Sequence, residues 1–379
     1  MTRAAPARAT EGAEERLVAI YRVRAEANAI AARAQAIAIE QSVEMPLPAI
    51  ADARVLAEIV GRVEGIAELG PGLFEVRVAL AVATTGSEPG QLMNMLFGNS
   101  SIHDDVVLHD VELPAKLTAA FFGPNRGIAG LRKLAGAERR AMTCSALKPQ
   151  GLPPQALAEL ARRLALGGLD FIKDDHGLAD QAYSPFAERV TACAEAVAAA
   201  SHATGRLTRY VPSLSGNLDE LRRQVALARA AGLEMVLVAP MIIGLPQLRA
   251  LVAENPALAF MAHPALAGAA RIAPPLLLGK LFRLMGADAT IFPNHGGRFG
   301  YSRETCGKLA EAARRPWDGV RPCLPVPAGG MTPERVPEML DFYGPDCMLL
   351  IGGGLLAAGE RLVEETTTFS DRVARHGFR

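Results

Sequence analysis

The stretch GGLDFIKDDH at residues 167–176 places a lysine, two aspartates and a histidine directly behind an apolar, strand-like run. Alternate residues of a strand face the same way, so Lys173 and Asp175 would share a face, with His176 next along the chain. These three side chains could hold a hard divalent cation if the lysine carries a carbamate, because a bare ammonium repels the ion. Two alternatives stay open, in which the lysine acts as a base or the residues form a salt-bridge network on the rim of the fold.

Lysine is rare in this chain, since only 6 of the 40 basic residues are lysines. Arginine does not deprotonate in proteins, whereas lysine can serve as a base, a nucleophile or a carbamate carrier. Each retained lysine is therefore a candidate for chemistry. Lys148, which follows another strand-like run, is the second such candidate.

The composition is typical of a soluble globular enzyme, with half of the 379 residues apolar and 21% charged. The formal net charge of zero argues against nucleic acid or an anionic membrane as a partner. Five scattered cysteines without CxxC spacing predict buried thiols in a reducing compartment. The polar N-terminus and the absence of a long apolar run predict a cytoplasmic location.

From about residue 126 onward, short apolar runs alternate with amphipathic helical stretches, which is the pattern of parallel βα units. The predicted strands are 142–147, 169–173, 207–212, 234–239, 258–262, 288–292, 323–327 and 347–351. Eight such units close most simply into a (β/α)8 TIM barrel. We therefore predict an α/β fold with a barrel catalytic domain over residues 126–379.

The first 125 residues break this rhythm. We expect a helix near 14–36 and strands at 36–44, 73–83 and 108–114. These elements predict a small α+β domain of ferredoxin-like topology over residues 1–125, in front of the barrel.

Active sites of such barrels lie at the carboxyl ends of the strands, so the residues that end each run are the candidates. The first predicted strand ends in Lys148, the second in residues 173–176 and the fifth in His263. Glycine pairs follow the seventh and eighth strands, namely Gly329, Gly330, Gly352 and Gly353. Their bare N–H groups could bind a phosphate beside helix N-termini, or the glycines simply end the strands.

GGLDFIKDDH resembles the GGLDFTKDDE signature of the RuBisCO large subunit, and similar segments run along nearly the whole chain. The segments are AIAIEQSVE (36–44), LFGNSSIHDDVVLHDVELP (96–114), SALKPQGL (145–152), PVPAGGM (325–331) and LLIGGGLL (349–356). Their order and spacing agree with the family, so the sequence is identified as a member of the RuBisCO superfamily.

The resemblance implies that Lys173 is carbamylated by CO2 and that Asp175 is a neighbouring Mg²⁺ ligand. His176 stands where the family has a glutamate ligand, so the site would bind Mg²⁺ less tightly, prefer another divalent cation or hold none. Lys148 matches the lysine that moves a proton during enolisation, with a rim salt bridge as the alternative. His263 matches the histidine after strand five, where a buried core histidine is the alternative.

The resemblance also implies a homodimer. Glu40 and Asn99 match residues that the family's amino-terminal domain lends to the active site of the partner subunit. Without the resemblance, they would be interpreted as an exposed glutamate and a turn asparagine.

Several positions depart from the carboxylating enzymes. Pro264 replaces the arginine that binds a second phosphate, and FPNHGGRFGYS (292–302) lacks the lysine of the mobile sixth loop, with Arg298 as its only arginine or lysine. The segments AHPALAGA and IAPPLLLGKLFRLMGAD instead resemble the RuBisCO-like proteins, the non-carboxylating branch of the family. One phosphate site kept and one lost fits a monophosphate substrate.

These features predict a metal-dependent enzyme that enolises a phosphorylated keto-sugar or keto-acid, by tautomerisation, isomerisation or decarboxylation. The expected cofactors are Mg²⁺ or another divalent cation and a CO2-derived carbamate on Lys173. The alternatives are a non-catalytic sugar-phosphate-binding protein with a disabled metal site and a true carboxylase.

Overall fold

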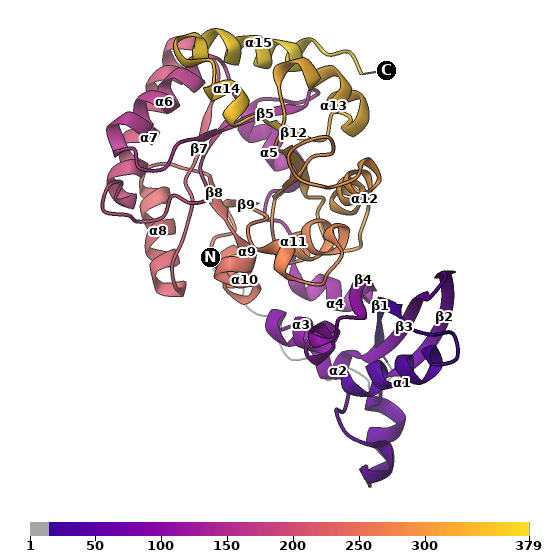
Figure 1. The fold of residues 1–379 in the computed structure, drawn as a ribbon. Helices are drawn as coiled ribbons and strands as arrows, with labels where there is room; N and C mark the ends of the chain where they lie inside the picture. The colour runs from indigo at the N-terminus through magenta and orange to yellow at the C-terminus, as the bar shows by residue number, and fades with distance from the viewer. Residues whose placement is uncertain (1–14, 379) are drawn as a thin grey trace.

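The computed structural model describes residues 15–378. Figure 1 shows a ring of short strands surrounded by helices, with a separate small sheet beside the ring. Within the described residues no helix is long and apolar enough to cross a membrane. All five cysteines are buried and unpaired, as the sequence predicts.

Four antiparallel strands form the small sheet in the order β2-β3-β1-β4. They are β1 (Arg16–Arg24), β2 (Arg62–Gly70), β3 (Leu73–Ala81) and β4 (Val106–Glu112). The helices α1 (Ile30–Glu40) and α3 (Pro89–Phe97) connect β1 to β2 and β3 to β4. This βαββαβ order is the ferredoxin-like topology, so the predicted α+β class of this part is confirmed.

The expected strand at 36–44 is wrong, and of the expected helix near 14–36 only residues 30–36 are helical, with residue 14 outside the described residues. Residues 16–24 form β1, in which Leu17, Tyr21 and Val23 alternate toward one fully buried face. A period of two is the strand signal, and Ala19 makes it weak here. The alanine-rich segment that follows forms α1 instead, because alanine is the best helix former.

The large sheet contains eight parallel strands in the order β7-β6-β5-β12-β11-β10-β9-β8. They are β5 (Met142–Leu147), β6 (Phe171–Asp174), β7 (Arg209–Val211), β8 (Met235–Val238), β9 (Ala259–Ala262), β10 (Ala289–Pro293), β11 (Leu324–Ala328) and β12 (Met348–Leu350). A parallel bridge between Ser213 and Leu237 closes the ring between β7 and β8. All eight predicted strands and the barrel are confirmed.

Helices surround the barrel on its outside (Figure 1). The longer ones are α6 (Pro154–Leu166), α7 (Phe186–Thr204), α8 (Leu218–Ala230), α10 (Leu245–Glu254), α12 (Arg303–Arg314), α13 (Val336–Tyr343) and α15 (Leu362–Arg375). Asn217 and Ser302 cap α8 and α12 by accepting hydrogen bonds from the backbone N–H two or three residues into the helix.

Short helical segments occupy the connections. They are α2 (Val82–Thr85), α4 (Ala115–Phe121), α9 (Pro240–Ile243), α11 (Phe282–Leu284), α14 (Gly353–Leu356), η1 (Leu47–Ala49), η2 (Val55–Ile59), η3 (Asn99–Ile102), η4 (Ala267–Ala269), η5 (Pro275–Leu281), η6 (Pro333–Arg335) and η7 (Gly359–Arg361). The division of the chain between residues 125 and 126 stays a prediction.

One core fills the barrel itself, with Phe171, Met261 and Val326 among its fully buried members. The helix α5 (Gly127–Ala135) adds Leu131 and Leu134 to this core, so it closes the amino-terminal end of the barrel. The carboxyl ends of the strands are left for polar side chains, which is where barrel enzymes carry their chemistry.

Candidate active site

The predicted lysines follow two neighbouring strands. β5 and β6 pair in parallel, with Ala146 opposite Lys173, and Lys148 comes directly after β5. His263 follows β9, which the barrel curvature brings to the same mouth. The chain thus gathers Lys148, Lys173, Asp175, His176 and His263 at the carboxyl end of the barrel.

Asp175 is the centre of this cluster. Lys148 Nζ lies 2.8 Å from Oδ2 of Asp175, and His176 Nδ1 lies 3.1 Å from Oδ1. Burial acts to raise the pKa of Asp175, but the hydrogen bonds from His176 and Lys148 hold it well below its usual range. The carboxylate is therefore ionised and fixes the positions of the Lys148 and His176 side chains.

The two histidines stack across the barrel mouth. The rings of His176 and His263 lie 4.0 Å apart with an interplanar angle of 10°. Burial and the nearby charge of Lys173 lower the pKa of His263 to about 2. The backbone N–H of Ala265 donates to His263 Nδ1 at 3.1 Å, so this neutral imidazole carries its proton on Nε2.

Lys173 is buried, with 3% of its surface exposed. Its Nζ donates to the carbonyl oxygen of Asp174 at 2.9 Å. Burial lowers the pKa of Lys173, since desolvation penalises the ammonium form, and the charge of Lys148 adds to this effect. The neutral amine is the form that reacts with CO2, so this environment favours the predicted carbamate.

Asp174 points to the other side of β6, as the period of a strand requires. Its buried carboxylate accepts hydrogen bonds from Arg189 Nε at 3.1 Å, the Tyr210 hydroxyl at 2.7 Å and the Ser213 N–H at 3.1 Å. Sequence reasoning missed this network. The signal was available, because a carboxylate on the helix-facing side of a buried strand needs a cation, and Arg189 lies on the buried face of α7.

The glycine pairs lie at the carboxyl ends of β11 and β12, which are neighbours in the barrel. Gly329 and Gly330 have φ values of 81° and 72°, a left-handed conformation that favours glycine. A Cβ at Gly352 or Gly353 would meet nothing within 4 Å, so their backbone is open to a ligand. Phosphate binding at these turns stays a prediction.

The loop after β10 packs directly on the first glycine turn. A Cβ on Gly297 would lie 2.2 Å from the carbonyl oxygen of Gly329, so the two backbones touch. Within this loop the Arg298 guanidinium lies 4.8 Å from the centre of the Phe299 ring. The Phe299 ring lies 3.4 Å from the position of a Cβ on Gly329, so this ring packs on the turn to which the sequence assigns phosphate.

Glu40 and Asn99 lie together but apart from the barrel cluster. Asn99 Nδ2 donates to Glu40 Oε1 at 2.8 Å and to Glu44 Oε1 at 3.0 Å. These side chains belong to the end of α1 and the start of η3, in the part of the molecule beside the ring of strands (Figure 1). No contact between them and Lys148 or Asp175 is found within the described chain.

Within residues 15–378, no group of three or more His, Cys, Asp and Glu side chains is placed to hold a metal ion. The predicted set of Lys173, Asp175 and His176 supplies two such ligands. The third would be the carbamate, whose formation the buried amine of Lys173 favours. The residues present therefore fit a divalent cation once Lys173 is modified.

Comparison with known proteins defines the class. Residues 127–376 match the family described as the ribulose bisphosphate carboxylase large chain, catalytic domain. The chain belongs to this RuBisCO large-chain family.

Individual relatives narrow the class to the RuBisCO-like proteins. The chain is 62% identical over 361 residues to a protein of Rhodospirillum rubrum named 5-methylthioribulose-1-phosphate isomerase, covering 95% of this chain and 96% of the relative. It is 34% identical over 317 residues to the 2,3-diketo-5-methylthiopentyl-1-phosphate enolase of Geobacillus thermodenitrificans, covering 79% and 76% of the two chains. A crystal structure of a RuBisCO-like protein from Rhodopseudomonas palustris superimposes with a TM-score of 0.91 at 56% identity, covering 97% and 99%.

These relatives confirm the prediction of a RuBisCO-like enzyme of the enolase and isomerase class, and the fold of barrel plus amino-terminal domain. The roles of the individual site residues are not tested by them. Those roles stay predictions.

We predict that Arg189→Leu lowers the free energy of unfolding by about 3–5 kcal/mol, because it leaves the carboxylate of Asp174 buried without its countercharge. Urea denaturation followed by circular dichroism measures the change. The matched control is Arg162→Leu on α6, whose ion pair with Glu159 is exposed and should contribute less than about 1 kcal/mol. If both variants lost the same free energy of unfolding, the buried ion pair would contribute no more to stability than the exposed one, and the prediction would be wrong.

Proposed function

We propose that the protein isomerises a singly phosphorylated keto-sugar of the 5-methylthioribulose 1-phosphate type through an enediolate. The observation that carries the proposal is that Asp175 contacts both Lys148 and His176. This cluster lies beside the buried amine of Lys173. The name of the relative that is 62% identical supports this substrate, whereas the relative named as an enolase is only 34% identical.

The reaction moves one proton and one carbonyl. A base removes the proton from the hydroxyl-bearing carbon next to the carbonyl. The electron pair of that C–H bond forms a C=C bond, and the π pair of the carbonyl moves onto its oxygen to form the enediolate. The neighbouring hydroxyl then loses its proton and becomes the new carbonyl, while the first oxygen and the former carbonyl carbon each take a proton, so the product is an isomer and no other reactant is consumed. The protein has to stabilise the anion and carry the proton.

Lys148 is proposed to carry that proton. Its Nζ is held 2.8 Å from Asp175 Oδ2 at the barrel mouth, with its side chain 37% exposed to the space where a substrate would lie. His263 is proposed to donate a hydrogen bond from Nε2 to a substrate oxygen, because its Nδ1 is occupied by the Ala265 N–H. A neutral imidazole can polarise a substrate carbonyl by donating a hydrogen bond to its oxygen.

The proposed metal ligands are Asp175, His176 and a carbamate on Lys173. A divalent cation held there supplies Lewis-acid polarisation of the substrate carbonyl. Two anionic groups and one neutral imidazole give the site one negative charge fewer than a set with a third carboxylate. This composition favours nitrogen-binding cations such as Mn²⁺ or Zn²⁺ more than a set of oxygens alone would.

The phosphate is proposed to bind at the turns formed by Gly329, Gly330, Gly352 and Gly353. The open backbone of Gly352 and Gly353 supports this role, as does Arg298 in the loop packed on the first turn. Pro264 follows His263, so that position offers no cation for a second phosphate. A monophosphate substrate agrees with this arrangement, and a bisphosphate does not.

A homodimer with a shared active site is part of the proposal. Glu40 and Asn99 form an exposed, hydrogen-bonded pair away from their own barrel mouth, which leaves them available to a partner subunit. A cytoplasmic location also stays a prediction.

We predict that Lys148→Ala and Lys173→Ala each slow the exchange of the substrate proton with D2O by at least about 100-fold, because the proton carrier or the anion-stabilising group is lost. NMR of 5-methylthioribulose 1-phosphate in D2O measures the exchange. Lys133→Ala, at an exposed position on α5, is the control and should exchange at the wild-type rate. Wild-type exchange in both active-site variants would overturn the catalytic assignment.

The wild-type exchange experiment, together with a ligand-binding assay and a labelled-CO2 assay, separates the other hypotheses. A non-catalytic sugar-phosphate-binding protein would bind the ketose without any exchange in the wild type. A carboxylase would fix labelled CO2 onto ribulose bisphosphate. Either result would replace the isomerase proposal.

We predict that bicarbonate tightens Mn²⁺ binding to the wild type by about tenfold or more, because the carbamate supplies a missing ligand. Isothermal titration with and without bicarbonate measures the effect. Lys173→Arg should abolish the bicarbonate dependence, since a guanidinium forms no carbamate, whereas Lys133→Arg should keep it.

His176→Glu tests the anomalous ligand in the same titrations. An added carboxylate should tighten Mg²⁺ binding more than Zn²⁺ binding, because Mg²⁺ prefers oxygen ligands. If bicarbonate has no effect in the wild type and His176→Glu changes neither affinity, the proposed metal set is wrong.

A further inference from the structure

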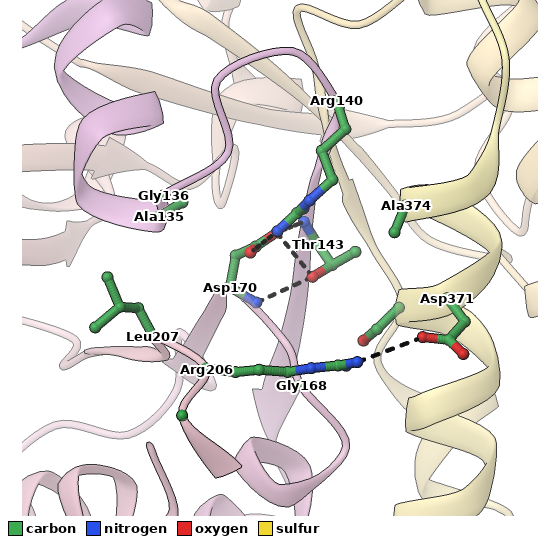
Figure 2. A pocket seen from close by; sticks show the side chains of 12 residues that line it. Ala135, Gly136, Arg140, Thr143, Gly168, Asp170, Arg206, Leu207, Asp371 and Ala374 are labelled. Carbon is green, nitrogen blue, oxygen red and sulfur yellow. Dashed lines mark hydrogen bonds and ion pairs between the residues drawn. The ribbon is translucent and has the colours of Figure 1, made fainter. Parts of the chain in front are cut away.

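A cavity of about 430 Å³ lies at the opposite end of the barrel from the predicted active site. Its wall is formed by the starts of β5 and β6, the turns after α5, α6 and α7, and the last turns of α15 (Figure 2). We call it the basal pocket and define it by Arg140, Asp170, Arg206, Ser370 and Asp371. Its volume is in the range of small-molecule sites.

On the floor of the basal pocket, one positive and one negative side chain neutralise each other. Arg140 donates to both carboxylate oxygens of Asp170 at 2.6 and 2.7 Å (Figure 2). The same carboxylate accepts hydrogen bonds from the N–H and the hydroxyl of Thr143. This pair is a satisfied structural unit with little affinity left for a ligand.

The rim of the pocket carries an arginine whose ion pair is long. Arg206 Nη2 lies 3.7 Å from Asp371 Oδ1, which is an ion pair without a hydrogen bond. Asp371 also accepts a hydrogen bond from Arg375 Nη2 at 3.1 Å. Two guanidinium groups therefore share one carboxylate, and Arg206 keeps its donors for an anion.

Gly168 positions this guanidinium. A Cβ at residue 168 would lie 2.4 Å from Arg206 Nη1, so the arginine side chain lies over bare backbone. Figure 2 shows Arg206 extended across the pocket toward Asp371. The glycine therefore fixes the cation against the wall of the cavity, where it loses less conformational freedom on binding a ligand.

Ser370 supplies an unsatisfied polar group. Its residue is 7% exposed, its hydroxyl is buried and has no hydrogen-bond partner, and it lines the cavity. A buried hydroxyl without a partner costs about 1–3 kcal/mol. An anion that accepts from Ser370 and Arg206 together would remove this cost.

The remaining wall favours a ligand that also donates hydrogen bonds. α5, α6 and α7 end at the pocket, since Gly136, Gly168 and Gly205 line it directly after their last turns. The ends of helices present carbonyl groups and partial negative charge. They accept from hydroxyl groups but repel a compact anion that has none to donate.

We propose that the basal pocket binds a small hydroxylated anion, such as a sugar phosphate or a sugar acid, through Arg206 and Ser370. Lys148, Lys173, Asp175, His176 and His263 do not line this pocket, so the site is separate from the one proposed for catalysis. The inference does not rest on the proposed function.

Isothermal titration of the full chain with ribose 5-phosphate, gluconate and sulfate tests the proposal. We expect either hydroxylated anion to bind more tightly than sulfate, which has no hydroxyl group to donate. Arg206→Gln should weaken that binding by about tenfold or more, since a hydrogen bond to a charged group is lost, and Ser370→Ala should weaken it less. Arg54→Gln, at an exposed site in the amino-terminal part, should leave it unchanged.

Ala374→Trp distinguishes binding in the basal pocket from binding at the catalytic mouth. Ala374 is exposed on α15 and lines the pocket, so a large side chain there fills the cavity from the surface without disturbing a core. Binding should be lost in this variant, whereas a ligand held at the catalytic mouth would still bind. Binding that survives both Arg206→Gln and Ala374→Trp overturns the site, as does a lack of binding by all three probes. Equal affinity for sulfate and the hydroxylated anions overturns the ligand class.

Discussion

Burial of charge at the end of β6 is the constraint on which the rest of the site depends. Lys173, Asp174 and Asp175 are consecutive and all three are buried. Each ionised group taken from water costs several kcal/mol unless a partner compensates it. Asp174 is compensated by Arg189 on the helix side, and Asp175 by Lys148 on the mouth side. Lys173 is instead shifted toward its neutral form.

This division has a chemical consequence, because neighbouring groups in one buried cluster differ in their protonation. Burial lowers the pKa of the Lys173 amine, which favours the neutral form that reacts with CO2, whereas hydrogen bonds keep the carboxylate of Asp175 ionised and His263 stays neutral with its proton on Nε2. An enolising site needs such separate states at one pH, namely a cationic or metal-bound stabiliser beside a neutral hydrogen-bond donor.

The sequence predicts most of the barrel and less of the site. Strands such as β5 and β11 are continuous apolar runs, and buried parallel strands have this composition. β1 was missed because its buried face includes the small Ala19 and the strand is bounded by arginines, which makes its alternation weak. The Lys148–Asp175 contact and the His176–His263 stack depend on how the ring closes, which no local pattern encodes. The place of Glu40 and Asn99 depends on assembly, which one chain does not contain.

The basal pocket and the active site share the same two strands. Arg140, Asp170 and Thr143 join the starts of β5 and β6, and Lys148 and Asp175 join the residues that follow their ends. Barrels usually separate stability at the amino-terminal face from chemistry at the carboxyl face. Here the unpartnered Ser370 and the loosely paired Arg206 lie within the stabilising face. These two groups keep hydrogen-bonding capacity on a face that otherwise serves stability, and the proposed ligand would use that capacity.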